Sequence, residues 1–179
     1  KQKLASTPTS VEAILVINCG SSSLKFSLIQ PECGKILLSG LAECLTTPQA
    51  SINIKHGVDS VNEELVETNA LPAPFDHKIA LNALVNKLTQ LNLVSNIVAV
   101  GHRVVHGGQN FSAPVRIDSA VLQELEGLTP LAPLHQPHNV KPVKLIMDAY
   151  PDMPQVACFD TAFHRTMPRI SEIYAIPRE

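Results

Sequence analysis

A short stretch rich in hydroxyl and amide groups, NCGSSSLK at residues 18–25, is the first candidate for chemistry. A Gly/Ser turn exposes backbone N–H groups and hydroxyls that can surround phosphate oxygens. Lys25 adds a positive charge that can reach the same phosphates, and the amide oxygen of Asn18 suits a hydrated Mg²⁺. The stretch does not match the GxxxxGK[ST] phosphate loop. Its composition alone favours an ordinary Gly/Ser hairpin, because such turns are common.

An arginine stands in a second polar stretch, GHRVVHGG at residues 101–108, directly after the apolar segment NIVAV. The guanidinium of Arg103 can bind a carboxylate or a phosphate through two parallel hydrogen bonds. The two glycines allow a ligand or another backbone segment to come close. A structural arginine paired with a core carboxylate is an equally good interpretation of the same residues.

A histidine and an aspartate complete the set of candidates. His135 lies between Pro133 and Pro137, and a stiff loop of this kind suits a preorganised hydrogen-bond donor to an anion. A buried structural histidine is the commoner alternative. Asp160 follows the apolar segment 155–159, where a carboxylate can bind Mg²⁺ or orient a nucleophile, although it could equally cap a helix. Phosphoryl transfer needs these parts together: positive charge, positioning and a metal-binding acid.

Hydrophobic periodicity predicts the elements that would position these side chains. A series of hairpins comes first, with strands expected at residues 13–18, 25–30, 35–43, 51–55 and 63–68. Helices then alternate with buried strands at residues 96–101 and 155–159. The helices are expected after Asp76, from Asp118 through Leu128, and with Pro142 in the first turn of a helix ending near Tyr150. This order predicts an α/β fold with a mixed sheet, in which ligands bind at the carboxyl ends of strands.

Composition excludes several classes of protein. Hydrophobic residues make up 45% of the chain and charged residues 17%, which is ordinary for a globular domain. The net charge of -2 and the scattered basic residues argue against nucleic acid as a partner. No apolar run reaches the length of a membrane span. The four cysteines show no paired motif and are expected to be reduced thiols, with a Cys33–Cys44 disulfide as an alternative.

Four motifs in this order, NCGSSSLKF, GHRVVHGG, LAPLHxP and FDTAFHxTMP, closely resemble the acetate kinase family. They span residues 18–168, and the related propionate and butyrate kinases share the same order. The resemblance implies a ribonuclease H-like/actin-like ATPase domain of the sugar-kinase, actin and Hsp70-like superfamily. Residues 13–179 are then expected to form the N-terminal domain, preceded by a disordered tail at residues 1–12. The C-terminal nucleotide-binding domain is expected to lie outside this chain.

The resemblance also implies roles for individual residues. It assigns phosphate or ATP contacts to Ser21, Ser23 and Lys25, and a metal contact to Asn18. It makes Arg103, His135 and Asp160 catalytic, and it assigns substrate binding to Arg103, Val105, Leu134 and His135. Gln136 departs from the asparagine expected in the family, which puts only the fine positioning of His135 in doubt.

The implied activity is reversible phosphoryl transfer from ATP to acetate, with Mg²⁺ or Mn²⁺ as cofactor, giving acetyl phosphate and ADP. The resemblance further implies a cytoplasmic enzyme that forms a homodimer through the absent domain, and an isolated chain that is inactive. Two alternatives stay open. One is propionate or butyrate kinase activity, because one methylene in an apolar pocket changes binding by only ~1–3 kcal/mol. The other is a binding module without catalytic activity.

Overall fold

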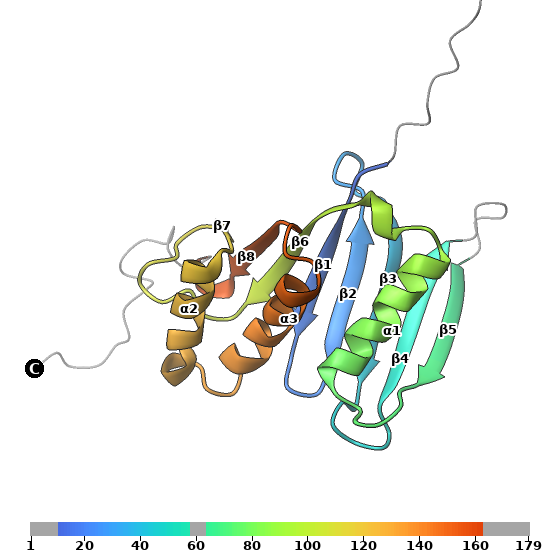
Figure 1. Ribbon diagram of the computed structural model, residues 1–179, viewed down its shortest axis with the longest axis horizontal. Helices are drawn as coiled ribbons and strands as arrows, with labels where there is room; N and C mark the ends of the chain where they lie inside the picture. The colour runs from blue at the N-terminus through green and yellow to red at the C-terminus, as the bar shows by residue number, and fades with distance from the viewer. Residues whose placement is uncertain (1–10, 58–63, 163–179) are drawn as a thin grey trace, which may run out of the picture.

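The protein is built on one eight-stranded sheet. The computed structural model describes residues 11–57 and 64–162. Its strands are β1 (Ala13–Cys19), β2 (Leu24–Ile29), β3 (Ile36–Glu43), β4 (Ser51–Gly57), β5 (Glu64–Ala70), β6 (Ile97–Val104), β7 (Val115–Arg116) and β8 (Gln155–Phe159). They lie in the order β5-β4-β3-β2-β1-β6-β8-β7 (Figure 1). Strands β1 to β5 pair antiparallel, whereas β1, β6 and β8 are parallel neighbours, so the predicted mixed sheet is confirmed.

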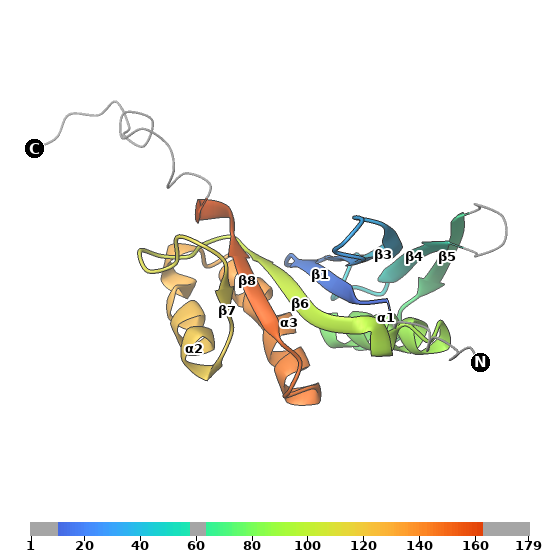
Figure 2. The same ribbon diagram turned by 90° about the horizontal axis from the view of Figure 1, so that it is seen from above.

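Three α-helices pack on one side of this sheet, as Figure 2 shows from above. They are α1 (His77–Gln90), α2 (Ser119–Gly127) and α3 (Gln136–Ala149), with short 3-10 helices η1 (Val94–Asn96) and η2 (Thr129–Leu131). The predicted N-caps are confirmed: Asp76 accepts from the backbone N–H of Ile79 at 3.0 Å, and Asp118 accepts from that of Val121 at 2.8 Å. Each cap satisfies an N–H that the first helical turn would leave unpaired.

Two of the predicted element boundaries differ from the structure by three residues or more. Strand β6 continues to Val104, three residues beyond its predicted end, because His102 and Val104 alternate into the core with 1% and 0% exposure. Helix α3 begins at Gln136, so Pro142 lies inside the helix and not in its first turn. Pro137 takes the first-turn position, where a missing N–H costs nothing.

One strand was not predicted, and some residues of the predicted elements and motifs lie outside the described structure. Strand β7 was not predicted; its two residues form an edge strand antiparallel to β8. Residues 1–10 of the expected tail, residue 63 of the fifth expected strand and residues 163–168 of the last motif lie outside the described residues.

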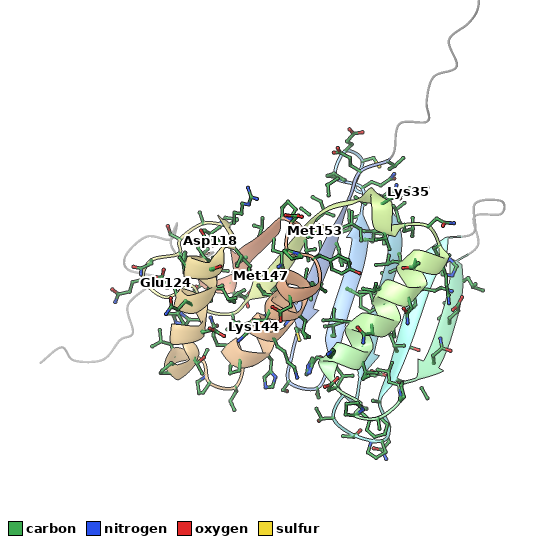
Figure 3. All side chains as sticks on the ribbon, viewed as in Figure 1. Lys35, Asp118, Glu124, Lys144, Met147 and Met153 are labelled. Carbon is green, nitrogen blue, oxygen red and sulfur yellow. The ribbon has the colours of Figure 1, made fainter. Side chains whose placement is uncertain are left out.

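The core divides into two clusters. The larger one packs α1 against β1 to β4, and the smaller one packs α2 and α3 against β6 and β8. On the side of α3 that faces α2, Figure 3 shows Met147 and Lys144; Lys144 also forms a 2.7 Å ion pair with Glu126. All four cysteines are free thiols, so the alternative of a Cys33–Cys44 disulfide is wrong. Within residues 11–57 and 64–162, no helix combines the length and apolar character that crossing a membrane requires.

Gly40 in β3 is expected to tolerate no side chain. It pairs with Phe26 across the sheet, and a Cβ at this position would overlap both the Phe26 ring and the backbone oxygen of Asn53. Gly40→Ala should therefore lower the free energy of unfolding by about 1–3 kcal/mol, measured by urea denaturation. Gly57→Ala is the control, because a Cβ there meets open space. Equal losses in the two variants would contradict this explanation.

Candidate active site

Four neighbouring strands, β2, β1, β6 and β8, bring polar side chains to the face of the sheet opposite the helices. Asn18 on β1 is the register partner of Lys25 on β2. On the other side, Ile17 pairs with His102 of β6, so the next residues, Asn18 and Arg103, point to the same face. Arg103 pairs in turn with Cys158 on β8, two residues before Asp160. The helices cover the opposite face (Figure 2), so in the described part of the chain these polar groups are left uncovered by helices.

Arg103 joins the ends of β1, β6 and β8 through its guanidinium. Its Nε donates to both carboxylate oxygens of Asp160 at 2.9 and 3.0 Å, and its Nη2 donates to Oδ2 at 2.6 Å. Its Nη1 donates to Oδ1 of Asn18 at 3.2 Å. The residues are 57 and 85 positions apart in sequence, so the contact is a product of the fold. The structure thus brings together three residues that the sequence analysis singled out in separate motifs.

This ion pair is open to solvent. The side chain of Arg103 is 49% exposed and that of Asp160 is 41% exposed, so the partner of Arg103 is not a core carboxylate. An exposed pair contributes at most about 1 kcal/mol to stability. The hydrogen bonds to Asp160 raise the pKa of Arg103, against the small opposing effect of its partial burial, so the group stays positively charged. The arrangement is better suited to binding an anion than to stabilising the fold.

The Gly/Ser turn lies beside this cluster. Its hairpin closes through the Gly20 N–H, which donates to the backbone oxygen of Ser23 at 2.9 Å. Ser21 and Lys25 are exposed, and Ser23 is half-buried. The ring of His77, at the start of α1, bonds through Nε2 to the Gly20 carbonyl at 2.8 Å. A carbonyl only accepts, so the proton of His77 lies on Nε2. Burial lowers the pKa of His77, which favours this neutral form.

His135 and Leu134 lie at the start of α3, near the end of β6. Both are exposed, Leu134 to 77%, so the alternative of a buried structural histidine is wrong. His135 occupies the N-cap position of α3 and not a separate loop. The adjacent Gln136 is fully buried and donates to the backbone oxygens of His106 at 3.3 Å and Leu125 at 3.0 Å. Gln136 therefore anchors this end of the helix beside the half-buried Val105 and its loop.

The two glycines of GHRVVHGG make room for the protein itself. A Cβ at Gly107 would crowd the backbone oxygen of Phe111 and the ring of Phe159. Gly108 has a positive φ of 62°, a conformation that favours glycine. The Gly107 N–H donates to the hydroxyl of Thr161 at 3.1 Å, which ties this loop to the end of β8. Of the two expected uses of these glycines, close approach of backbone segments is the one that is observed.

The oxygen ligands at the cluster fit a magnesium ion. Among residues 11–57 and 64–162, no three His, Cys, Asp or Glu side chains form a metal-binding group. The available donors are the carboxylate of Asp160 and the amide oxygen of Asn18, which meet at Arg103. Mg²⁺ commonly uses one or two protein oxygens and completes its shell with water and substrate phosphates. This donor set therefore suits a hard divalent cation, Mg²⁺ or Mn²⁺.

Sequence reasoning missed the buried polar residues beneath the cluster, such as His102, which precedes Arg103. Its Nε2 bonds to Oε1 of Gln155 at 2.7 Å, and Gln155 donates to the Val143 carbonyl at 3.2 Å. A polar residue at a core position of a strand was the available signal. Desolvation lowers the pKa of His102 from 6.5 to about 4, and the Gln155 bond offsets this only in part.

The depressed pKa of His102 predicts acid-sensitive folding. The unfolded chain takes up this proton near pH 6.5 and the folded chain only near pH 4. The stabilisation is therefore complete above pH 6.5 and is lost as the pH falls from 6.5 to 4, by on the order of 3 kcal/mol. Urea denaturation at several pH values should show a shallower decline for His102→Gln, which removes the titrating ring. Parallel curves for the two proteins would contradict the assignment.

The chain is similar to known proteins in both sequence and fold. The model of the acetokinase family matches residues 13–179. An acetate kinase of Chromobacterium violaceum is 44% identical over 165 residues, which are 92% of this chain and 40% of that protein. Two crystal structures share the fold, each with a TM-score of 0.79. A propionate kinase of Francisella tularensis is 40% identical, with 93% of this chain and 41% of that chain covered. A Porphyromonas gingivalis acetate kinase is 37% identical, with 93% and 42% covered.

These matches settle the fold and the family. The α/β architecture is that of the propionate kinase and acetate kinase structures, so the expected actin-like ATPase fold is confirmed. The chain spans about two fifths of the length of the relatives it matches. The family model covers the described strand ends that carry Asn18, Arg103 and Asp160. On this evidence the chain belongs to the acetokinase family.

Proposed function

We propose that this chain forms part of an acetate kinase, which transfers a phosphoryl group between ATP and acetate. One observation carries the proposal: Asn18, Arg103 and Asp160 meet, accessible to ligands, at the carboxyl ends of three adjacent strands. Ligands of open α/β sheets bind at such ends. The relatives from Chromobacterium violaceum and Porphyromonas gingivalis, both named acetate kinases, support the choice of reaction.

In the proposed reaction, an acetate oxygen attacks the γ-phosphorus of ATP in line with the bond to ADP. The new P–O bond forms as the bond to the β-phosphate oxygen breaks, and ADP leaves with that electron pair. Arg103 and His135 would offset the negative charge on the equatorial oxygens. Lys25 and the turn with Ser21 and Ser23 would hold the phosphates of the nucleotide.

Asp160 would act as the catalytic carboxylate, and with Asn18 it would hold the divalent cation, Mg²⁺ or Mn²⁺. When bound, the cation would supply positive charge to the phosphates. Both residues now bond to Arg103. The guanidinium and the acid are therefore kept within reach of the same ligand, and an incoming anion would compete with Asp160 for Arg103.

The alkyl side of the substrate would contact Val105 and Leu134. The structural similarity to a propionate kinase favours propionate as the second candidate substrate. Leu134 is 77% exposed, so a longer alkyl chain would be able to contact it as well. The resemblance to acetate kinases also implies a homodimer and a cytoplasmic location, and both belong to this proposal.

A chimera tests the proposed activity. In it, this chain replaces the matched segment of the Chromobacterium violaceum acetate kinase, and hydroxylamine traps any acyl phosphate formed. We expect hydroxamate that depends on ATP and on acetate, with a higher kcat/KM for acetate than for propionate. The 179-residue chain assayed alone is expected to form none. A folded chimera that forms no hydroxamate with either acid would refute the kinase assignment and favour a binding module.

A further inference from the structure

A buried asparagine connects two of the strands that carry the candidate site. Asn139 lies in the first turn of α3 and is only 4% exposed. Its Nδ2 donates to the backbone oxygen of Cys19 at 2.7 Å. Its Oδ1 accepts from the backbone N–H of Val105 at 2.9 Å. One side-chain amide thus satisfies a carbonyl at the end of β1 and an N–H just after the end of β6.

The position of this bridge matters because β1 and β6 separate there. Their parallel pairing begins at Ala13 with Ile97 and ends at Ile17 with His102. Cys19 and Val105 lie beyond that last pair. A side-chain amide has the donor and acceptor of a peptide group, so Asn139 can replace the interstrand bonds that would otherwise continue the ladder. It therefore links the two strand ends where their direct pairing stops.

The bridged strand ends carry two candidate site residues. Asn18 is the neighbour of Cys19, and Arg103 is two residues before Val105. The two side chains make their 3.2 Å contact on the uncovered face. Asn139 approaches from the helix side, where Cys19 is buried to 2% exposure. Both hydrogen bonds of its side-chain amide are to backbone atoms of the strand ends, so any effect on the site passes through the strands.

A second helix residue holds the same turn. His77 from α1 bonds to the carbonyl of Gly20, the residue after Cys19. Two successive carbonyls of the turn are thus held by buried side chains from α1 and α3. The N–H and C=O of a trans peptide point in opposite directions, so the Ser21 N–H is directed away from His77. The bond from His77 thus holds the turn so that the Ser21 N–H points away from the helices.

We propose that Asn139 is a positioning residue for phosphoryl transfer, whose amide sets the spacing of Asn18 and Arg103. The proposal rests on the kinase activity proposed above. If the role of Asn139 were purely structural, its substitution would lower stability and leave the turnover of the folded protein unchanged. A positioning role lowers kcat in folded protein, because misplacement of reacting groups by about 1 Å can cost a factor of ~100 in rate.

The kinetic test compares two substitutions on α3 in the chimera. Asn139→Leu keeps the size and removes both hydrogen bonds, so kcat should fall at least about tenfold while the KM values for ATP and acetate change less than about threefold. Val143→Ala is the matched control, since Val143 is fully buried on the same helix but packs in the smaller core cluster. It should lower the urea midpoint and leave kcat within about twofold.

Hydrogen exchange in the unsubstituted 179-residue chain tests the bridge without any substitution or assay. The Val105 N–H should exchange slowly, as expected for an amide bonded to a buried acceptor. Fast exchange at Val105, or a normal kcat in folded Asn139→Leu, would overturn the positioning role. If the unsubstituted chimera has no activity, the kinase assignment and the role built on it both fall. Slow exchange at Val105 would then still establish the bridge itself.

Discussion

Asp160→Asn should lower the kcat of the chimera by about 100-fold or more and leave its fold intact. The substitution keeps the side-chain volume and removes the negative charge that we assign to cation binding and to alignment of the reacting groups. The ion pair with Arg103 is solvent-exposed, so its loss should cost about 1 kcal/mol or less of stability. Measurement of kcat together with the urea midpoint separates the two effects.

Asp118→Asn is the matched control for this substitution. Asp118 caps α2 through the N–H of Val121 and lies in no candidate site. Asparagine caps a helix about as well as aspartate, so both stability and kcat should be nearly unchanged. Near-normal kcat in Asp160→Asn would reject the catalytic role of Asp160. A large loss of stability without a loss of kcat would show that the carboxylate serves only the fold.

Arg103→Ala should reduce kcat/KM of the chimera far more than Arg116→Ala. Arg103 makes four hydrogen bonds to Asp160 and Asn18 at the candidate site. The loss of charge-assisted bonds to a bound anion costs roughly 1.5–3 kcal/mol, which corresponds to about 10- to 150-fold in rate. Arg116 is an exposed residue of the edge strand β7, and its removal should change kcat/KM by less than about twofold.

A third variant distinguishes charge from geometry at this position. Arg103→Lys keeps the positive charge and loses the planar fork that binds a carboxylate or phosphate through two bonds. It should therefore recover only part of the activity lost in Arg103→Ala. Comparable kcat/KM losses for Arg103→Ala and Arg116→Ala would refute the assignment of Arg103 to the site.

Much of the architecture could be predicted from local patterns. Short apolar runs located β1 and β8, and aspartates before helical repeats located the starts of α1 and α2. These signals are local because caps and strand periodicity depend on residues only a few positions apart. The predicted element boundaries were wrong where tertiary packing outweighed these local signals. His102 reads as polar in sequence, yet it is buried beside Gln155 and continues β6.

The candidate site was likewise predictable only in part. The sequence by itself identified Asn18, Arg103 and Asp160 as candidate site residues, because each stands in a recognisable motif after or near an apolar run. Their meeting on one uncovered face follows from the parallel register of β1, β6 and β8. The rule that ligands bind at strand ends anticipated this edge, but not the individual hydrogen bonds.

Only the tertiary structure identified the residues that hold those strand ends in place. Asn139 is 120 positions from Cys19 and 34 from Val105, and nothing in its local sequence indicates either partner. Its contacts depend on where α3 packs against the sheet and on where β1 and β6 part. Both are decided by burial of side chains from distant segments, and such long-range packing leaves no periodic signal around the residue that depends on it.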